Sequence, residues 1–549
     1  MSDSPRLPAR PSLEQLQKQA KDLLRQWRAG EPSAVNRLRA ATPAPKDSVT
    51  LADAQFALAR EYGFESWALM KHFVATLAPP EQANYRIDTF ENTLAVDGAA
   101  SGDEWERIVT VMEEQGIDGL RAHSVTDAAL IRISRLERLT RLHLGGATEI
   151  TDEGLARLAY LPRLTDLNLS GRNGRFTDRG LEVMRLLPNL RRVSLCWQPS
   201  VSDGGIAPLA ACAHLEEVDL MGTSTGNGAI RALAGKPALR RFKTGRNVTD
   251  AGLALLRHFP VFQTWQGGEP RYNLMSFTAD PNHLLIDGPF TDAGLASLAG
   301  LDGLFALSFF WHSLAFTGAG IAALERLPHL SFLGCGGAQC DDDAMRHIAL
   351  LPRLRMLMAQ GTVASDEGFA ALSRSRSLEF LWGRECPNLG SRGFRALAGM
   401  PALRGLAVSC KNVDDAALAL LPAFPALREL LPMDVSDDGF RHVGGCGRLE
   451  ALWCMYCRET GDQATDHIAG LALKSYYAGK TGITDRSLEI LGRMESLERL
   501  EFHACGGITT AGIAHLARLP KLREIGLEGS AGMTEDVARM FPAAVHVRY

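Results

Sequence analysis

A short motif that returns about every 25 residues is the feature that most constrains how this chain can fold. The motif is an apolar residue, Thr or Ser, Asp, any residue, Gly or Ala, and a second apolar residue, and it begins at seventeen positions from Val125 to Met533, some copies being degraded. Successive copies lie 22 to 26 residues apart, except for one interval of 42 residues between Val248 and Phe290. Such a period is typical of a solenoid, in which each unit packs only against its neighbours.

Each repeat predicts one short helix followed by one short strand. The Thr/Ser-Asp pair is typical of a helix N-terminus, and apolar residues such as Leu155, Leu158 and Leu161 follow at helical spacing. The segment 164–169, L-x-x-L-x-L, has the alternation of a strand. One helix and one strand cannot bury their own apolar faces, so the units must stack. We therefore predict an α/β solenoid of about 17 repeats over residues 117–549, with parallel strands on its concave face and helices on its convex face.

The repeats resemble leucine-rich repeats of the cysteine-containing class, which are related to ribonuclease-inhibitor-type horseshoes and to the repeats of F-box substrate receptors. Segments 212–220 and 446–454 match the start of the pattern C-x-x-L-x-x-L-x-L-x-x-C/N, while Cys386, Cys457 and Cys505 stand at its last position. The resemblance implies a horseshoe and says little about function, because this scaffold serves many binding roles.

Two segments precede the repeats. Residues 1–85 predict a small all-α module; segments 12–40 and 51–67 resemble the helical leader found before ankyrin repeats in many bacterial proteins. Residues 86–116 resemble one degenerate ankyrin helix pair, so a helix pair is expected there. We expect these segments to cap the exposed end of the array, the alternative being an appended domain with its own task.

The long interval places an insertion near residues 267–283. In a solenoid an insertion becomes a loop, often on the binding face, although a neutral surface loop is an equal alternative.

Composition excludes several classes of protein. The chain has 59 Lys and Arg against 63 Asp and Glu, a net charge of −4, so a general nucleic-acid binder is not expected. No run approaches about 18 apolar residues, so no membrane span is expected. The first residues lack the apolar core of a secretory signal, and ten cysteines in 549 residues are too few for a disulfide scaffold. We expect a cytoplasmic, monomeric protein with reduced thiols.

Two motifs resemble catalytic or phosphate-binding sequences. Residues 222–226 spell G-x-S-x-G after an expected strand, but they stand in register with the other repeat turns, and no Asp and His partners are indicated. Residues 479–481, G-K-T, lack the glycine that a phosphate loop requires five positions earlier, where Lys474 stands. We therefore expect no catalytic residues and no cofactor.

The pair Cys454 and Cys457 forms a C-x-x-C that would need further ligands, such as Cys446 and Cys505, to hold zinc. Repeat register assigns these cysteines to packing instead, since a buried free cysteine behaves as a small hydrophobic residue. No metal site is expected.

Strand alternation indicates which side chains point out of the concave face. The early outward positions are polar, and from the insertion onward they become aromatic and rich in Met, residue types that are enriched at interface anchors. The alternative is that these side chains pack against one another and beneath the inserted loop. The predicted partner-binding residues are Phe310, Met358, Trp382, Arg384, Trp453, Met455, Tyr477 and His503.

These observations favour a non-enzymatic module that binds a protein or peptide on its concave face, with Trp382 and Trp453 as anchors. An alternative is a substrate-recognition adaptor of a ubiquitin-ligase-like or effector system, although no F-box precedes the repeats. A hydrolase or small-molecule-binding protein is the third possibility.

Overall fold

The structure, a computed structural model, describes residues 13–41, 49–62, 64, 66–67, 69–70, 84–265, 267, 271–275, 282–310, 315–455, 457, 460–529 and 535–548. The chain forms two compact units that divide between Arg86 and Ile87. The parts of the predicted insertion at residues 268–270 and 276–281 lie outside the described residues.

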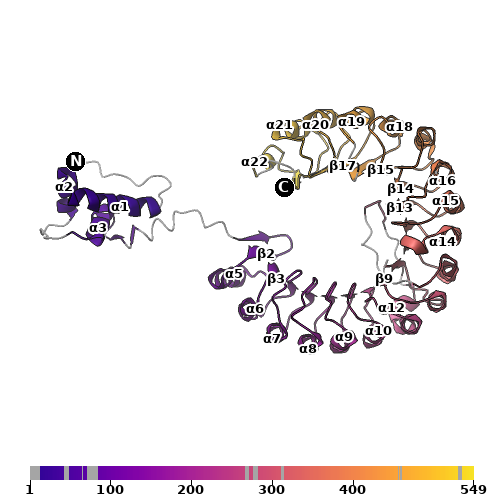
Figure 1. Cartoon of the computed structure of the whole chain (residues 1–549), viewed down its shortest axis with the longest axis horizontal. Helices are drawn as coiled ribbons and strands as arrows, with labels where there is room; N and C mark the ends of the chain where they lie inside the picture. The colour runs from indigo at the N-terminus through magenta and orange to yellow at the C-terminus, as the bar shows by residue number, and fades with distance from the viewer. Residues whose placement is uncertain are drawn as a thin grey trace. The chain divides into compact units, whose positions relative to one another are not determined.

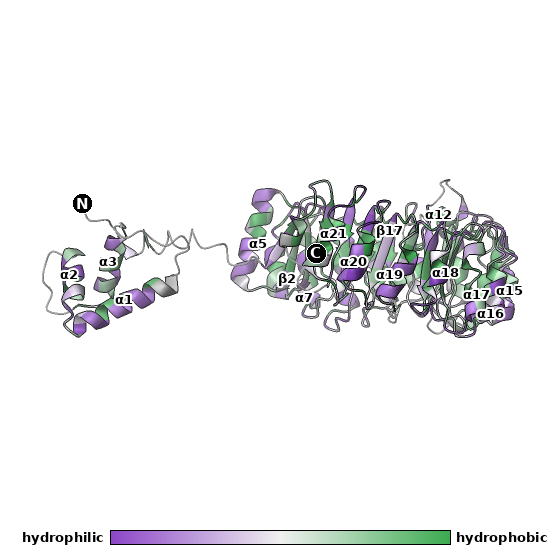
Figure 2. Cartoon of the chain, turned by 90° about the horizontal axis from the view of Figure 1, so that it is seen from above, coloured by the Kyte–Doolittle hydropathy of each residue, from purple (hydrophilic) through white to green (hydrophobic). Residues whose placement is uncertain are grey.

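In the first unit, the helices whose bounds the structure describes are α1 (Leu13–Arg28), α2 (Pro32–Ala41) and α3 (Leu51–Glu61). Hydrophilic and hydrophobic stretches alternate along α1 (Figure 2), as expected for a helix that buries one face. Its buried residues include Leu16 and Leu23, which belong to two small apolar clusters shared with α3. Thr50 begins α3 with a reciprocal capping box to Asp53, which satisfies two backbone donors at the helix start. Helices therefore precede the solenoid, as the sequence predicts.

The second unit is built on one sheet of twenty strands. Strands β2 to β20 pair in chain order and in parallel, and β1 pairs with β2. Their bounds are β1 (Tyr85–Asp88), β2 (Thr93–Ala99), β3 (Gly119–Ser124), β4 (Arg141–His143), β5 (Asp166–Asn168), β6 (Arg192–Ser194), β7 (Glu217–Asp219), β8 (Arg241–Lys243), β9 (His283–Ile286), β10 (Ala306–Phe309), β11 (Phe332–Gly334), β12 (Met356–Met358), β13 (Phe380–Gly383), β14 (Gly405–Ser409), β15 (Glu429–Met433), β16 (Ala451–Met455), β17 (Ser475–Gly479), β18 (Arg499–His503), β19 (Glu524–Gly526) and β20 (His546–Arg548).

Short helices alternate with these strands. The α-helices are α5 (Gly102–Gln115), α6 (Asp127–Ile133), α7 (Asp152–Leu155), α8 (Asp178–Leu181), α9 (Asp203–Ile206), α10 (Asn227–Leu233), α11 (Asp250–Leu253), α12 (Pro260–Gln263), α13 (Asp292–Ala296), α14 (Asp342–Ile348), α15 (Asp366–Leu372), α16 (Ser391–Leu397), α17 (Asp415–Leu418), α18 (Phe440–Gly444), α19 (Asp462–Ile468), α20 (Asp485–Leu491), α21 (Thr510–Leu516) and α22 (Glu535–Ala538). The 3₁₀ helices are η1 (Ala156–Tyr160), η2 (Glu182–Leu186), η3 (Ala207–Ala211), η4 (Ala254–His258), η5 (Gly318–Arg326), η6 (Gly337–Gln339) and η7 (Leu421–Ala423).

The repeats form a curved solenoid with the strands along its inner side and the helices along its outer side (Figure 1). The middle residue of each three-residue strand from β4 to β19, such as Leu142 or Leu167, points between these layers and is at most 2% exposed. The sheet continues across the insertion, since β8 pairs with β9 and places Arg241 opposite His283. The predicted α/β solenoid is therefore confirmed.

The expected helix pair at residues 86–116 is wrong. The segment contains strands β1 and β2 and the single helix α5, which Ser101 begins with a capping box to Glu104. Leu94 and Val96 are buried at alternate positions of β2, the period of a strand rather than of a helix. This segment is the first strand-helix unit of the solenoid, and it lacks the Thr-Asp motif that marks the later units.

The Asp of the repeat motif links each helix to the next unit. Asp152 accepts hydrogen bonds from the backbone N–H of Thr177 at 2.7 Å and from its hydroxyl at 3.0 Å. It also accepts one from the N–H of Gly180 at 3.0 Å. A Cβ at Gly180 would lie 2.5 Å from the same carboxylate oxygen, so at this position the preceding unit's Asp occupies the space that a side chain would need. Equivalent Asp-to-Thr bonds join Asp127 to Thr151 and Asp485 to Thr509.

Among the described residues, no helix combines the length and apolar character that a membrane span requires.

Candidate interaction surface on the concave face

The first and third residues of the strands from β4 to β17 form two outward columns along the concave face, because side chains alternate across a strand. We name them the first and the second outward column. Adjacent parallel strands lie about 4.8 Å apart, so residues of one column in successive repeats are direct neighbours.

From β4 to β8 both columns are polar and largely charged. The first column reads Arg141, Asp166, Arg192, Glu217 and Arg241, and the second reads His143, Asn168, Ser194, Asp219 and Lys243. Opposite charges pair: Lys243 Nζ lies 2.7 Å from Asp219 Oδ2, and Arg192 contacts Asp166. The column side chains from β4 to β7 line an open cleft of about 630 Å³ together with Glu91 and Arg121. Because the charges neutralise one another, this half has no strong attraction for ions of one sign.

From β10 to β17 apolar and aromatic residues predominate in the columns, with Ser308, Glu429 and Ser475 as polar members. The first column holds Ala306, Phe332, Met356 and Phe380 on four successive strands. The second column holds Met358, Trp382, Leu431, Trp453 and Tyr477. The sequence prediction covered the second column and omitted the first, although its signal, an apolar residue two positions before each central residue, is present in the sequence.

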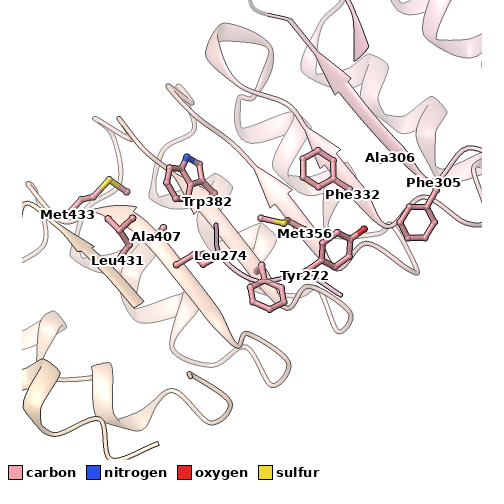
Figure 3. Packing of buried hydrophobic residues seen from close by; sticks show 11 residues of the cluster. Tyr272, Leu274, Phe305, Ala306, Phe332, Met356, Trp382, Ala407, Leu431 and Met433 are labelled. Carbon is pink, nitrogen blue, oxygen red and sulfur yellow. The ribbon is translucent and has the colours of Figure 1, made fainter. Parts of the chain in front are cut away.

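Part of the insertion lies on this apolar half. We name residues 271–275 the strap. Tyr272 is 9% exposed and Leu274 is fully buried, and both belong to one apolar cluster with Phe332, Phe380 and Trp382. Figure 3 shows the two strap side chains beside the side chains of the strands. The position of the strap could not be predicted from the repeats, since its residues follow no repeat register.

Three kinds of contact hold the strap. The Tyr272 ring packs between two aromatic rings, with centroids 6.5 Å from Phe332 and 6.4 Å from Phe380. The Arg355 guanidinium carbon lies 5.5 Å from the centroid of the same ring, within the range of a cation–π contact. The backbone N–H of Leu274 donates a hydrogen bond of 2.8 Å to Glu429 Oε2. Burial raises the pKa of Glu429, while the bond from Leu274 and the charge of Arg404 oppose this shift.

The structure differs from the sequence-based expectation for Trp382, one of the predicted binding residues. Trp382 is 6% exposed and lies within the cluster that Tyr272 and Leu274 complete, so it is not the exposed anchor that its strand position suggested. The alternative of packing beneath the inserted loop applies to this residue. Met358, Trp453 and Met455 pack against the same cluster and are only partly buried.

The other four predicted residues lie outside that cluster. Tyr477 and His503 are half-buried and continue the surface onto β17 and β18, where Tyr477 pairs with Trp453 in register. Arg384 Nη2 lies 3.3 Å from Glu385 Oε1. Phe310 follows β10 and packs edge-to-face on Trp197, with ring centroids 6.0 Å apart.

The motif at residues 222–226 is a repeat turn. The Thr223 hydroxyl donates to the carbonyl of Leu220 at 2.6 Å and lies 2.8 Å from the Thr225 hydroxyl. Ser224 accepts a bond of 3.2 Å from Arg246. These hydroxyls are engaged in holding the turn, and none of these bonds joins Ser224 to a general base.

All ten cysteines are buried and free. Burial raises the pKa of Cys446 to about 12 and that of Cys457 to about 12, so both thiols stay protonated at neutral pH. Within the described part of the chain, no group of three or more His, Cys, Asp or Glu residues is arranged to hold a metal ion.

The fold and the repeat together define a leucine-rich-repeat solenoid protein. No family model matches the sequence, and no curated protein matches it. Among solved structures, the chain is similar to TLR13 in its complex with ssRNA13, with 15% identity, a TM-score of 0.46 and coverage of 81% of this chain and 67% of that chain.

Two other solved structures are similar to the chain. One is an internalin (inlF) from Listeria monocytogenes, with 17% identity, a TM-score of 0.25 and coverage of 80% of this chain and 91% of that chain. The other is yeast Rad7 in its complex with Elc1, with 13% identity, a TM-score of 0.32 and coverage of 82% and 88%. At these identities the likeness concerns the fold alone.

Proposed function

We propose that this protein is a non-enzymatic interaction module that binds a protein or peptide partner on the concave face of its repeats. The observation that supports this most is the surface on β16 to β18, where Trp453, Met455, Tyr477 and His503 are half-buried at outward positions. Each of these side chains keeps part of its surface exposed on the concave face, where a partner can reach it.

The chemistry of this surface suits a protein partner. Trp and Tyr supply large contact areas with few rotatable bonds, and Met adapts to irregular shapes. Arg384 adds a charged group near the aromatic residues, and Arg is also enriched at interface anchors. The binding surface in this proposal consists of Met358, Arg384, Trp453, Met455, Tyr477 and His503, with Phe310 at its edge and Trp382 beneath the strap.

The proposal also includes the repeat class, the nature of the first unit, the compartment and the oligomeric state. The repeats are of the cysteine-containing class, and the first unit is a leader like that of bacterial ankyrin-repeat proteins. The free state of all ten thiols supports a reducing compartment, the cytoplasm. The chain acts as a monomer and needs no cofactor.

The test is to substitute an anchor and measure binding to the partner that affinity capture identifies. Truncating a central anchor costs at least about 2 kcal/mol, so Trp453→Ala is expected to weaken binding at least about 30-fold. Tyr160→Ala is the matched control, because Tyr160 is an aromatic residue on a helix and is 60% exposed. Circular dichroism melting checks that both variants are folded.

If Trp453→Ala and Tyr160→Ala bind equally well, the concave surface is not the binding site. Capture of a ligase subunit would favour the adaptor alternative, and a retained metabolite would favour a small-molecule-binding protein.

A further inference from the structure

The strap lies on the concave face in the manner of a bound peptide. Its contacts begin with Tyr272 against Phe332 on β11 and end with Leu274 on Glu429 of β15, so these two residues together span five successive strands. It therefore crosses the repeats instead of pairing along one strand. Its two buried side chains, Tyr272 and Leu274, are two residues apart, which is the spacing at which an extended segment presents side chains to one side.

The sheet supplies a complementary place for each of these side chains. Phe332 and Phe380 flank the Tyr272 ring, and Arg355 lies beside it. Gly405 interrupts the bulky first column beside Phe380 and Leu274: a Cβ at Gly405 would lie 2.4 Å from Phe380 Cδ1 and 3.3 Å from Leu274 Cδ1, so the missing side chain leaves room for both. Aromatic flanks for one side chain and a notch for the next are features that recognise an aromatic-x-Leu sequence.

The strap's main chain is recognised as well. From β11 to β15 the first column has one charged residue, Glu429. Its carboxylate accepts a hydrogen bond of 2.8 Å from the N–H of Leu274. Recognition of the backbone by a fixed acceptor, with side chains in adjacent places, is the general mode by which proteins bind extended peptides.

The strap also adjoins the surface of the proposed function. Trp453 and Met455 pack against the same cluster as Tyr272 and Leu274 while remaining partly buried. A peptide that occupied the strap's place and continued along the concave face would therefore reach these residues without a break.

We propose that the strap is an intramolecular substitute for the partner, and that the face from β11 to β15 recognises an extended peptide carrying an aromatic residue and, two positions later, Leu. This inference rests on the proposed function and names its partner class. The partner displaces the strap, whose tether gives it an effective concentration on the order of millimolar, so the intact chain binds such a peptide more weakly than a chain without the strap's side chains.

The test is a titration with a synthetic fluorescent peptide of residues 267–283, followed by anisotropy. The protein is the full chain carrying Tyr272→Ser and Leu274→Ser, which removes the competing side chains. We expect this double variant to bind the peptide at least about tenfold more tightly than the wild-type chain does. A peptide of the same composition in scrambled order is the control and is expected not to bind.

The proposal is overturned if the folded double variant binds neither peptide, or binds both equally. If the double variant does not fold, the single variant Leu274→Ser, which keeps the Tyr272 side chain, takes its place. We expect this variant to bind the peptide more tightly than the wild-type chain does. Equal affinity of the two proteins for the peptide then overturns the proposal. If the peptide fails to bind while Trp453→Ala still weakens partner capture, the strap inference is wrong and the proposed function stands. If the peptide binds while Trp453→Ala leaves partner capture unchanged, the binding surface of the proposed function is wrong and the inference about peptide recognition on β11 to β15 stands.

Discussion

Glu429 shows how one buried carboxylate connects the strap to the pH dependence of stability. Burial raises its pKa above the ordinary 4.5, with Glu450 also raising it and Leu274, Arg404 and Arg499 lowering it. The folded state therefore favours the protonated form. That contribution to stability is fully present below pH 4.5 and is lost as the pH rises through the folded pKa.

We predict that Glu429→Gln removes this pH dependence. The amide oxygen can still accept the Leu274 N–H, and no charge is buried at neutral pH. The melting temperature of the variant at pH 7 is expected to equal or exceed that of the wild-type chain, and the difference should vanish at acid pH. A variant that is less stable at pH 7 would show that the ionised carboxylate itself holds the strap.

The ten cysteines give a second prediction at the residue scale. A thiol reacts as its thiolate, and these thiols are buried, with burial raising the pKa of Cys386 to about 12. Titration with a thiol reagent at pH 8 is expected to detect negligible reaction in the native protein and all ten thiols after unfolding. Rapid reaction of a native thiol would contradict the packing role of the cysteines.

At the scale of the helix and strand elements, the Asp-Gly contact between units is the link to test. Gly180→Ala places a Cβ 2.5 Å from Asp152 Oδ1 and 3.1 Å from Leu155 Cδ1. Overpacking of this kind costs about 1–3 kcal/mol, which denaturant melts will measure. Gly470→Ala is the matched control, because nothing lies within 4 Å of its Cβ position, and we expect it to be neutral. Equal stability of the two variants would show that the contact with Asp152 does not limit the size of the side chain at position 180.

The elements also show what sequence could and could not predict. The repeat period predicted the strands and helices because the Thr-Asp-x-Gly motif and the Leu spacing are local in sequence. The unit at residues 90–116 was mistaken for a helix pair because Ser101 begins its helix without that motif. At the site, strand alternation identified Trp453 and Met455 as outward residues. Trp382 is buried in a cluster that includes Leu274, more than 100 residues away in the chain and outside any period.

At the scale of the whole molecule, the next prediction concerns which residues cap the N-terminal edge of the sheet. The sequence predicts that residues 1–85 do so, whereas β1 pairs directly with β2 and covers the edge of the sheet. We expect a chain beginning at Asn84 to keep the melting temperature of the solenoid, and a chain beginning at Thr93 to lose stability, because its first strand edge is exposed. Equal loss in both chains would show that the N-terminal unit is the cap.

The most direct test of the concave-face interaction is hydrogen exchange of the full chain, alone and in complex with its captured partner. We predict that the partner slows backbone exchange in β16 and β17, residues 451–455 and 475–479, and speeds it in the strap at residues 271–275, which the partner releases. Protection confined to the convex helices, with the strands and the strap unchanged, would contradict recognition on the concave face.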